Sequence, residues 1–367
     1  MLQLIEENRQ DDVSSAEENP DSPFWPDTKR LLERGMVTPV IGNFAIYKLI
    51  GDMQGIAQAW AKNIQSPLSE DHNRDLARVA QFYSIQESNR EAKRHYLATL
   101  KDFLVQGAAL DEKTDKKLLK MLQHQDKYKD HTFSELADRL GYPRYPSLEE
   151  NPFRLLAELP LSVYLTTSSH NFLEVALGQN SRKAKPVSEI YQWREGLEHL
   201  PSIYDTEPKY EPSLERPLVY HLYGLDSFPE SLVFTEDDYL DFLVNVTHEA
   251  SEVRTSSQTD VGHSLPRRQL PSTVIQALST PLVMLGYDIY TWEFRALLKG
   301  LIQPRSRNWV DRGFSVQIKP TSDDNSAADE QIDQKIKEYL IDYFKQSKFD
   351  LYWGTPEECA LDLYKTL

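Results

Sequence analysis

Short apolar runs of the kind that form buried strands recur along the chain, and most of them are followed by a helical pattern. This alternation of strands and helices predicts a mainly parallel α/β protein. Residues 313–318 also alternate like a strand, although they are not among the strongest runs. The predicted strands lie near residues 37–42, 161–167, 217–222, 281–285 and 349–353.

One long block interrupts this alternation. Residues 71–140 carry only helical patterns, with Leu76, Val79 and Ala80 on one helical face. We therefore predict a helical subdomain, at approximately residues 60–150, inserted after the first strand–helix unit. The acidic, weakly periodic residues 1–22 predict a flexible tail, which leaves residues 23–367 as one domain.

Other segments suggest connections and helix boundaries. Residues 179–216, rich in proline, tyrosine and charge, predict a long connection, and the polar residues 251–268 predict a loop. A helix is expected to begin at Thr235, whose hydroxyl can cap it ahead of three acidic residues. We expect another helix over residues 332–344 and a last one after the capping box at residues 355–358.

Composition excludes several classes of function. The net charge of −16 argues against broad binding to nucleic acid. The single cysteine, Cys359, excludes an intramolecular disulfide and a multi-cysteine zinc site, and it fits a cytoplasmic protein. No apolar run approaches the ~20 residues that cross a bilayer. The first residues lack the basic and apolar regions of a secretory signal, so a cytoplasmic location without membrane contact is expected.

Polar residues follow the predicted strands at the point where each strand ends. Residues 168–171, for example, separate the strand at 161–167 from a helical pattern that opens at Phe172. Ligands bind at this edge of a parallel sheet, although the same residues could simply cap the helix at an ordinary corner. We expect one cleft to be lined by Gly42, Thr166, Ser168, Tyr223, Gly286 and Tyr287.

A series of short motifs also follows in a recognisable order. They occupy residues 38–43, 78–83, 165–174, 219–224, 232–239, 285–295 and 351–354. Their order and spacing resemble the sirtuin-like (silent-information-regulator-like) family, and specifically its prokaryotic branch associated with anti-phage defence. The resemblance runs from about residue 24 to the end of the chain.

This resemblance implies a Rossmann-like domain with a smaller helical domain and a cleft for NAD between them. It implies glycosidic cleavage of NAD with release of nicotinamide, which depletes NAD in infected cells. It further implies a homo-oligomer and a fused or co-encoded defence module. Zinc occurs in the deacylating branch, but the cysteines for it are missing, so no metal is expected. The implied cofactor-binding positions are Gly42, Asn43, Thr166, Thr167, Gly286, Tyr287 and Asp288, and the catalytic positions are Ser168, His170, His221 and Tyr223.

The chain departs from the family pattern at the positions that matter for catalysis. Phe44 stands where a second glycine is expected and would crowd the pyrophosphate. Ser168 replaces an asparagine that orders the ribose and a water, and His170 replaces an acidic residue. Tyr223 replaces the histidine base, and a phenol with a pKa near ~10 is a poor base at neutral pH. His221 lies on the same strand face as Tyr223 and is expected to point toward the cleft.

Three functions follow from these departures. The favoured one is a degenerate sirtuin-like domain that binds NAD or an ADP-ribose derivative and acts through assembly. The second is an active NAD glycohydrolase with a rewired site that uses His170 or His221 as its base. The third is a structural partner domain without a nucleotide. In the plainer interpretation, His170 caps the following helix and His221 is a hydrogen-bonded core residue.

Overall fold

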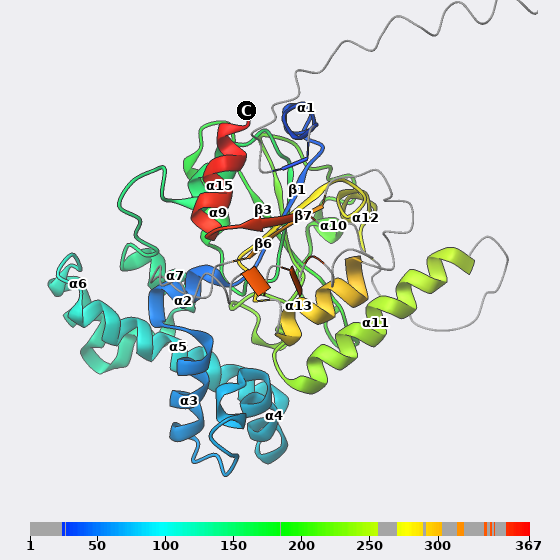
Figure 1. Cartoon of the computed structure of the whole chain (residues 1–367). Helices are drawn as coiled ribbons and strands as arrows, with labels where there is room; N and C mark the ends of the chain where they lie inside the picture. The colour runs from blue at the N-terminus through cyan, green and yellow to red at the C-terminus, as the bar shows by residue number, and fades with distance from the viewer. Residues whose placement is uncertain are drawn as a thin grey trace, which may run out of the picture.

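A parallel sheet with helices on both faces forms the centre of the molecule in a computed structural model (Figure 1). The structure describes residues 24–25, 27–183, 185–255, 270–288, 291–302, 314–318, 334–335, 338–339, 341 and 350–367. The sheet order is β3-β4-β2-β1-β5-β6-β7. The strands are β1 (Thr38–Ile41), β2 (Val163–Thr166), β3 (Val187–Ile190), β4 (Leu218–His221), β5 (Leu282–Leu285), β6 (Phe314–Ile318) and β7 (Asp350–Trp353).

The predicted α/β fold with a parallel sheet is confirmed, and each of the predicted strands overlaps an observed one. The long connection predicted over residues 179–216 contains a strand that was not predicted, because β3 pairs there with β4 and forms one edge of the sheet. The sequence of this strand shows no continuous apolar run, because Ser188 and Glu189 interrupt its apolar residues. The strand-like alternation at residues 313–318 corresponds to β6, which pairs with β5 and β7.

The strand order creates a crevice at the carboxyl ends of β1 and β5. The chain leaves β1 and returns through β2 on one side, whereas β5 pairs with β1 on the other side. Loops that leave two such neighbouring strands diverge to opposite faces of the sheet, and ligands bind in the opening between them.

Helices and loops fill the chain between β1 and β2, as expected for residues 71–140, and α3 to α6 extend away from the sheet (Figure 1). The limits of a subdomain at residues 60–150 remain a prediction. The helices of this region are α2 (Phe44–Ile50), α3 (Met53–Asn63), α4 (Leu76–Gln86), α5 (Asn89–Leu110), α6 (Lys116–Gln123), α7 (Phe133–Arg139) and α8 (Pro152–Glu158).

The remaining helices cover the sheet. The backbone N–H of Asp238 donates to the hydroxyl of Thr235 at the start of α11, and the capping box at Thr355 opens α15, both as predicted. Because α11 runs to Thr255, the loop prediction is wrong for residues 251–255. The helices are α1 (Thr28–Glu33), α9 (Phe172–Gln179), α10 (Ile203–Thr206), α11 (Glu236–Thr255), α12 (Ser272–Ala277), α13 (Trp292–Ala296), the π-helix η4 (Leu297–Ile302) and α15 (Pro356–Lys365).

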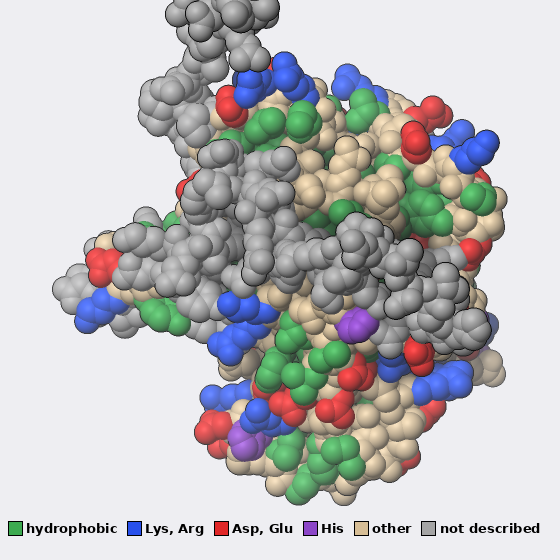
Figure 2. Space-filling view, turned by 90° about the vertical axis from the view of Figure 1, so that its right-hand side faces the viewer, with side chains coloured by type: hydrophobic (Ala, Val, Ile, Leu, Met, Phe, Trp, Pro, Cys, Tyr) green, Lys and Arg blue, Asp and Glu red, His purple; other side chains and the backbone are tan. Residues whose placement is uncertain are grey.

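Two predictions concern parts of the chain that the structure does not describe. The flexible tail at residues 1–22 lies outside the described residues, as does most of the helix expected over residues 332–344. Within the described ranges, no helix is long and apolar enough to span a bilayer. Acidic and basic side chains alternate over the coloured part of the face in Figure 2.

Alternate residues of the strands pack into two separate hydrophobic cores, one on each face of the sheet. Ile41 and Leu285 pack into the core that includes α2, α8, α9 and α15, whereas Val40 and Met284 pack into the core with α11 and α13. Strand side chains point to opposite faces in turn, so four-residue strands buried on both sides appear in the sequence as continuous apolar runs.

A buried ion pair connects the helical region to the sheet-covering helices. Lys93 on α5 and Asp238 on α11 lie 3.0 Å apart, and both side chains are almost completely buried. Burial lowers the pKa of Lys93 to about 8, although the Asp238 carboxylate opposes this shift. Breaking such a pair leaves an uncompensated buried charge, so it constrains how α5 is placed relative to α11.

We predict that Gly42→Ala destabilises the fold. A Cβ atom at this position would lie 2.4 Å from the carbonyl oxygen of Gly286, so the backbone at the ends of β1 and β5 would have to separate. We expect a loss of roughly 1–3 kcal/mol in the free energy of unfolding, measured by urea denaturation. Gly178→Ala on α9 is the control, because a Cβ there meets nothing within 4 Å and alanine favours the helix. Equal stabilities for the two variants would contradict the close approach.

Candidate functional site

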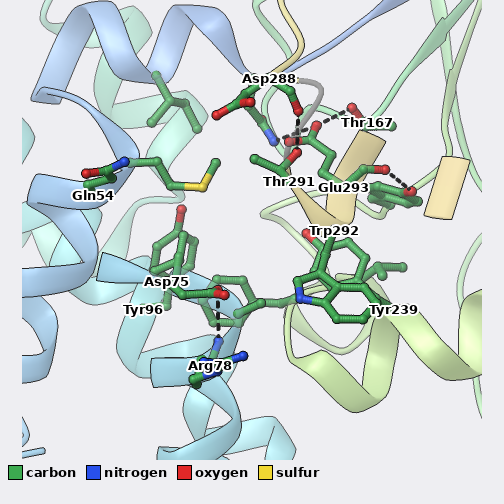
Figure 3. A pocket seen from close by; sticks show the side chains of 18 of the residues that line it. Gln54, Asp75, Arg78, Tyr96, Thr167, Tyr239, Asp288, Thr291, Trp292 and Glu293 are labelled. Carbon is green, nitrogen blue, oxygen red and sulfur yellow. Dashed lines mark hydrogen bonds between the residues drawn. The ribbon is translucent and has the colours of Figure 1, made fainter. Parts of the chain in front are cut away.

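A pocket of about 640 Å³ opens at the carboxyl edge of the sheet, between the ends of β1, β2 and β5 and the helices α2 to α5. This volume is in the range of small-molecule and cofactor sites. Figure 3 shows Asp75, Arg78 and Tyr96 on the side of the helical region, facing Asp288, Trp292 and Glu293 from the segment after β5. The pocket therefore lies at the crevice that the strand order creates.

Glu293 is the buried acidic residue of the pocket wall. It is the second residue of α13 and only 6% exposed. Its Oε1 accepts a hydrogen bond from the hydroxyl of Thr167 at 2.5 Å and another from the side-chain amide of Asn43 at 3.3 Å. The hydroxyl of Tyr287 lies 3.0 Å from Thr167 Oγ1. Residues that follow β1, β2 and β5 thus converge on one carboxyl group (Figure 3).

Burial raises the pKa of Glu293 to about 7, and the nearby Asp288 carboxylate adds to the rise. The hydrogen bonds from Thr167 and Asn43 act in the opposite direction, because they favour the ionised form. A carboxyl group with such a pKa changes its charge near neutral pH, as groups at functional sites commonly do.

Tyrosine side chains surround this carboxyl group. Tyr223 donates from its hydroxyl to the backbone carbonyl of Glu293 at 2.7 Å. Tyr47, Tyr96 and Tyr239 also line the pocket. Burial raises the pKa of all of these phenols above their ordinary value, so they remain protonated at neutral pH. Tyr223 can therefore donate a hydrogen bond but does not act as a base.

The two histidines proposed as alternative bases lie behind the pocket, and neither forms part of its wall. His221 is fully buried, with Nε2 at 2.6 Å from Glu174 and Nδ1 at 3.0 Å from the carbonyl oxygen of Ser168. Burial alone would lower the pKa of His221, but the Glu174 carboxylate raises it above its ordinary value. The expectation that His221 points toward the cleft is wrong, and its contacts agree with a hydrogen-bonded core histidine.

His170 is also enclosed by the core. Its ring stacks on Phe172 at 3.9 Å, and burial lowers its pKa to about 3. Within the described residues, neither ring nitrogen has a hydrogen-bond partner. The ring is therefore neutral at physiological pH, and it does not cap the helix that follows.

The residues expected to line one cleft meet at the sheet edge, but most of them lie beneath the pocket. Tyr223 is on the wall, as are Asn43, Thr167 and Asp288 from the predicted cofactor positions. The others are not on the wall, and the hydroxyls of Thr166 and Ser168 bond to backbone carbonyls of the first strand and its turn. The hydroxyl of Ser168, for instance, donates to the carbonyl of Gly42 at 2.8 Å. The residues beneath the wall are Gly42, Thr166, Ser168, Gly286 and Tyr287.

Phe44 occupies a different place from the one expected. A Cβ atom on Gly286 would lie 2.2 Å from the Phe44 ring, and this ring stacks on Phe153 at a centroid distance of 5.3 Å. Phe44 therefore packs into the core and is not on the pocket wall. The expectation that it crowds a ligand in this pocket is wrong.

Sequence reasoning missed several residues of the wall. Glu293 lies within the motif at residues 285–295 but has no signal of its own, because a single glutamate near the start of a helix is ordinarily exposed to solvent. Arg78 reaches the pocket from α4, where it also pairs with Glu236 at 3.2 Å. Arg74 and Arg295 contribute further positive charge from exposed positions on the wall. No pattern in the chain links these distant positions to the strand ends.

The fold is that of a Rossmann-like α/β protein, with a pocket at the carboxyl edge of its sheet. Residues 162–344, about half of the chain, match the model of a family described as a SIR2-like domain. This match supports the sirtuin-like family for the chain. It includes Thr167, Tyr223 and Glu293, whereas Asn43 and Arg78 come from the part before it. No curated protein matches the chain.

The described residues contain no group of three or more histidine, cysteine or acidic side chains placed to hold a metal ion.

We predict that Glu293→Gln stabilises the protein at alkaline pH. Because the folded-state pKa of Glu293 exceeds its ordinary value of 4.5, the stability present below pH 4.5 is lost as the pH rises through about 7. Glutamine keeps the acceptor oxygen without this loss. The variant should gain up to roughly 3 kcal/mol relative to wild type at pH 8 and much less at pH 5. Denaturant unfolding at both pH values measures the difference, and a gain independent of pH would contradict it.

We predict that His221→Ala is strongly destabilising because it leaves the Glu174 carboxylate without its buried partner. A loss of about 3–5 kcal/mol in unfolding free energy is expected. Because the pKa of His221 is raised in the folded state, its charged contribution should be greatest at acidic pH and decline as the pH rises through that pKa. His199→Ala is the control, since this exposed ring lies 3.6 Å from Glu230 and contributes little.

Proposed function

We propose that the pocket binds NAD or an ADP-ribose derivative. The observation that carries this proposal is the convergence of Asn43, Thr167 and Glu293 at the crevice of a sheet whose strands β2 to β6 lie in the region that matches a SIR2-like domain. Dinucleotides bind in this position in doubly wound sheets. The pocket volume of about 640 Å³ is consistent with such a ligand.

The side chains of the wall suit the parts of a dinucleotide. Arg74, Arg78 and Arg295 supply positive charge for a diphosphate, and guanidinium groups bind phosphate oxygens through several donors at once. Amide and hydroxyl groups of Asn43 and Thr167 suit ribose hydroxyls. The aromatic rings that line the same pocket offer surfaces for base or nicotinamide stacking.

We further propose that the domain is catalytically degenerate. The imidazole route to NAD hydrolysis has no base in this pocket, because Tyr223 is a protonated phenol and His170 and His221 lie behind the wall. Loss of a general base typically costs 10²–10⁴-fold in rate. The domain then acts by binding the nucleotide and by assembling.

The biological setting follows from the resemblance of the ordered motifs. On that basis we propose a role in prokaryotic anti-phage defence, exercised as a homo-oligomer together with a fused or co-encoded module. Nucleotide binding would then control assembly or the activity of the partner module, and the third candidate, a partner domain without a nucleotide, is not favoured.

Calorimetric titration tests nucleotide binding. Wild type should bind NAD and ADP-ribose, and Arg78→Gln should weaken both by about tenfold, because one charge-assisted hydrogen bond contributes ~1.5 kcal/mol or more. Arg94→Gln is the matched control, since Arg94 lies on α5 in an exposed pair with Glu91 and is not part of the wall. Absence of binding, or equal effects of the two variants, would contradict the nucleotide site.

Release of nicotinamide tests degeneracy. Wild-type protein incubated with NAD should release nicotinamide very slowly or not at all. Rapid release that His170→Ala or His221→Ala abolishes, in variants shown to be folded, would instead support a rewired glycohydrolase.

A further inference from the structure

A carboxyl group that is buried without a cation requires an explanation. Among the described residues, Glu293 forms no ion pair with lysine, arginine or histidine, and the nearby charge that affects it is another carboxylate, Asp288. Its hydrogen bonds come from neutral groups, Thr167 and Asn43. Such an arrangement disfavours the ionised form in the free protein and lowers stability at neutral pH. A bound cation would reverse this penalty.

The surroundings of Glu293 suit a flat cation. Tyr47, Tyr96 and Tyr239 line the same pocket from α2, α5 and α11, and Trp292 adds a partly exposed indole. The faces of aromatic rings attract cations, especially where water is excluded. A carboxylate among aromatic rings therefore favours a ligand group that is both aromatic and positively charged.

The opposite side of the pocket carries guanidinium groups next to acidic side chains. Figure 3 shows Arg78 across the pocket from Glu293. Arg78 pairs with Glu236, whereas Asp75 caps the start of α4 by accepting from the backbone N–H of Arg78. The pocket thus combines a buried carboxyl group with guanidinium donors on the opposite wall, and oxidised NAD combines a positively charged nicotinamide ring with a negatively charged diphosphate.

We propose that Glu293 is the counter-charge of the nicotinamide ring and makes the pocket selective for NAD⁺ over NADH and ADP-ribose. The proposal rests on the nucleotide site proposed above and names the form of the nucleotide that this site prefers. NADH has nearly the same shape as NAD⁺ but carries a neutral ring, and ADP-ribose has no ring at this end. A preference for NAD⁺ over NADH therefore reports the charge of the ring.

The preference should depend on pH with a definite sign. Several ionisable groups lie around Glu293 or on the same wall. They are Asp288 on its own segment, Tyr47, Tyr96, Tyr223, Tyr239 and Tyr287 from the neighbouring elements, and Asp71, Arg74, Asp75, Arg78 and Arg295 on the wall. Burial keeps the tyrosines protonated between pH 6 and 8. Because Glu293 has a pKa of about 7, it ionises over this range, so affinity for NAD⁺ should increase as the pH rises. Affinity for ADP-ribose should not increase with it.

The experiment is calorimetric titration of the full chain with NAD⁺, NADH and ADP-ribose at pH 6 and pH 8. At pH 8, wild type should bind NAD⁺ about tenfold more tightly than NADH, as expected for an ion pair in a partly dehydrated site. This ratio should shrink at pH 6. Glu293→Gln should remove both the preference and its pH dependence and leave ADP-ribose affinity within about twofold, which shows that the variant is folded.

Asp241→Asn is the control, because this exposed carboxylate lies on α11, two residues after Tyr239, and is not part of the wall. It should retain the preference for NAD⁺. Equal affinities of wild type for NAD⁺ and NADH at both pH values would overturn the role of Glu293 but would leave the nucleotide site in place. A preference that persists in Glu293→Gln, or that Asp241→Asn removes instead, would also overturn it. Failure of all three nucleotides to bind would overturn the nucleotide site itself and this inference with it.

Discussion

The close approach of β1 and β5 at their carboxyl ends is the constraint on which the site depends. Gly42 and Gly286 pass each other with no space for a Cβ atom, and the Phe44 ring fills the space above Gly286. Because the backbones meet there, the segments that follow them start close together. Asn43 can then reach Glu293, which lies 250 residues further along the chain. A wider separation would leave two polar loops instead of one carboxyl group with converging donors.

The buried carboxyl group of Glu293 lowers the stability of the folded protein. A carboxyl group whose pKa is raised to about 7 weakens the folded state near neutral pH, and a glutamine would be easier to accommodate. Functional sites often contain such unfavourable groups, because a ligand restores the interaction that the free protein lacks. The same reasoning separates Glu293 from Glu174, which already has His221 as a buried partner.

The histidines illustrate how residue type and location must be considered together. His170 and His221 have the chemistry of a general base, and both lie within a few residues of a strand end. Yet one stacks on Phe172 in the core, and the other is held between Glu174 and a backbone carbonyl. The pocket wall is instead formed in part by Tyr223, whose hydroxyl donates to the backbone carbonyl of Glu293. Of these three side chains only Tyr223 lines the pocket, so neither imidazole is placed to act there as a general base.

The sequence by itself determined the fold class, most of the strands and the helical region after β1, because four-residue strands buried on both faces leave clear apolar runs. It did not reveal β3, where Ser188 and Glu189 break the run, and it misplaced Phe44 and His221. It located the edge of the sheet where Asn43, Thr167 and Tyr223 line a pocket. Only the tertiary structure decided that Glu293 and Arg78 join them, because burial and the pairing of distant segments, which leave no local pattern, set their environment.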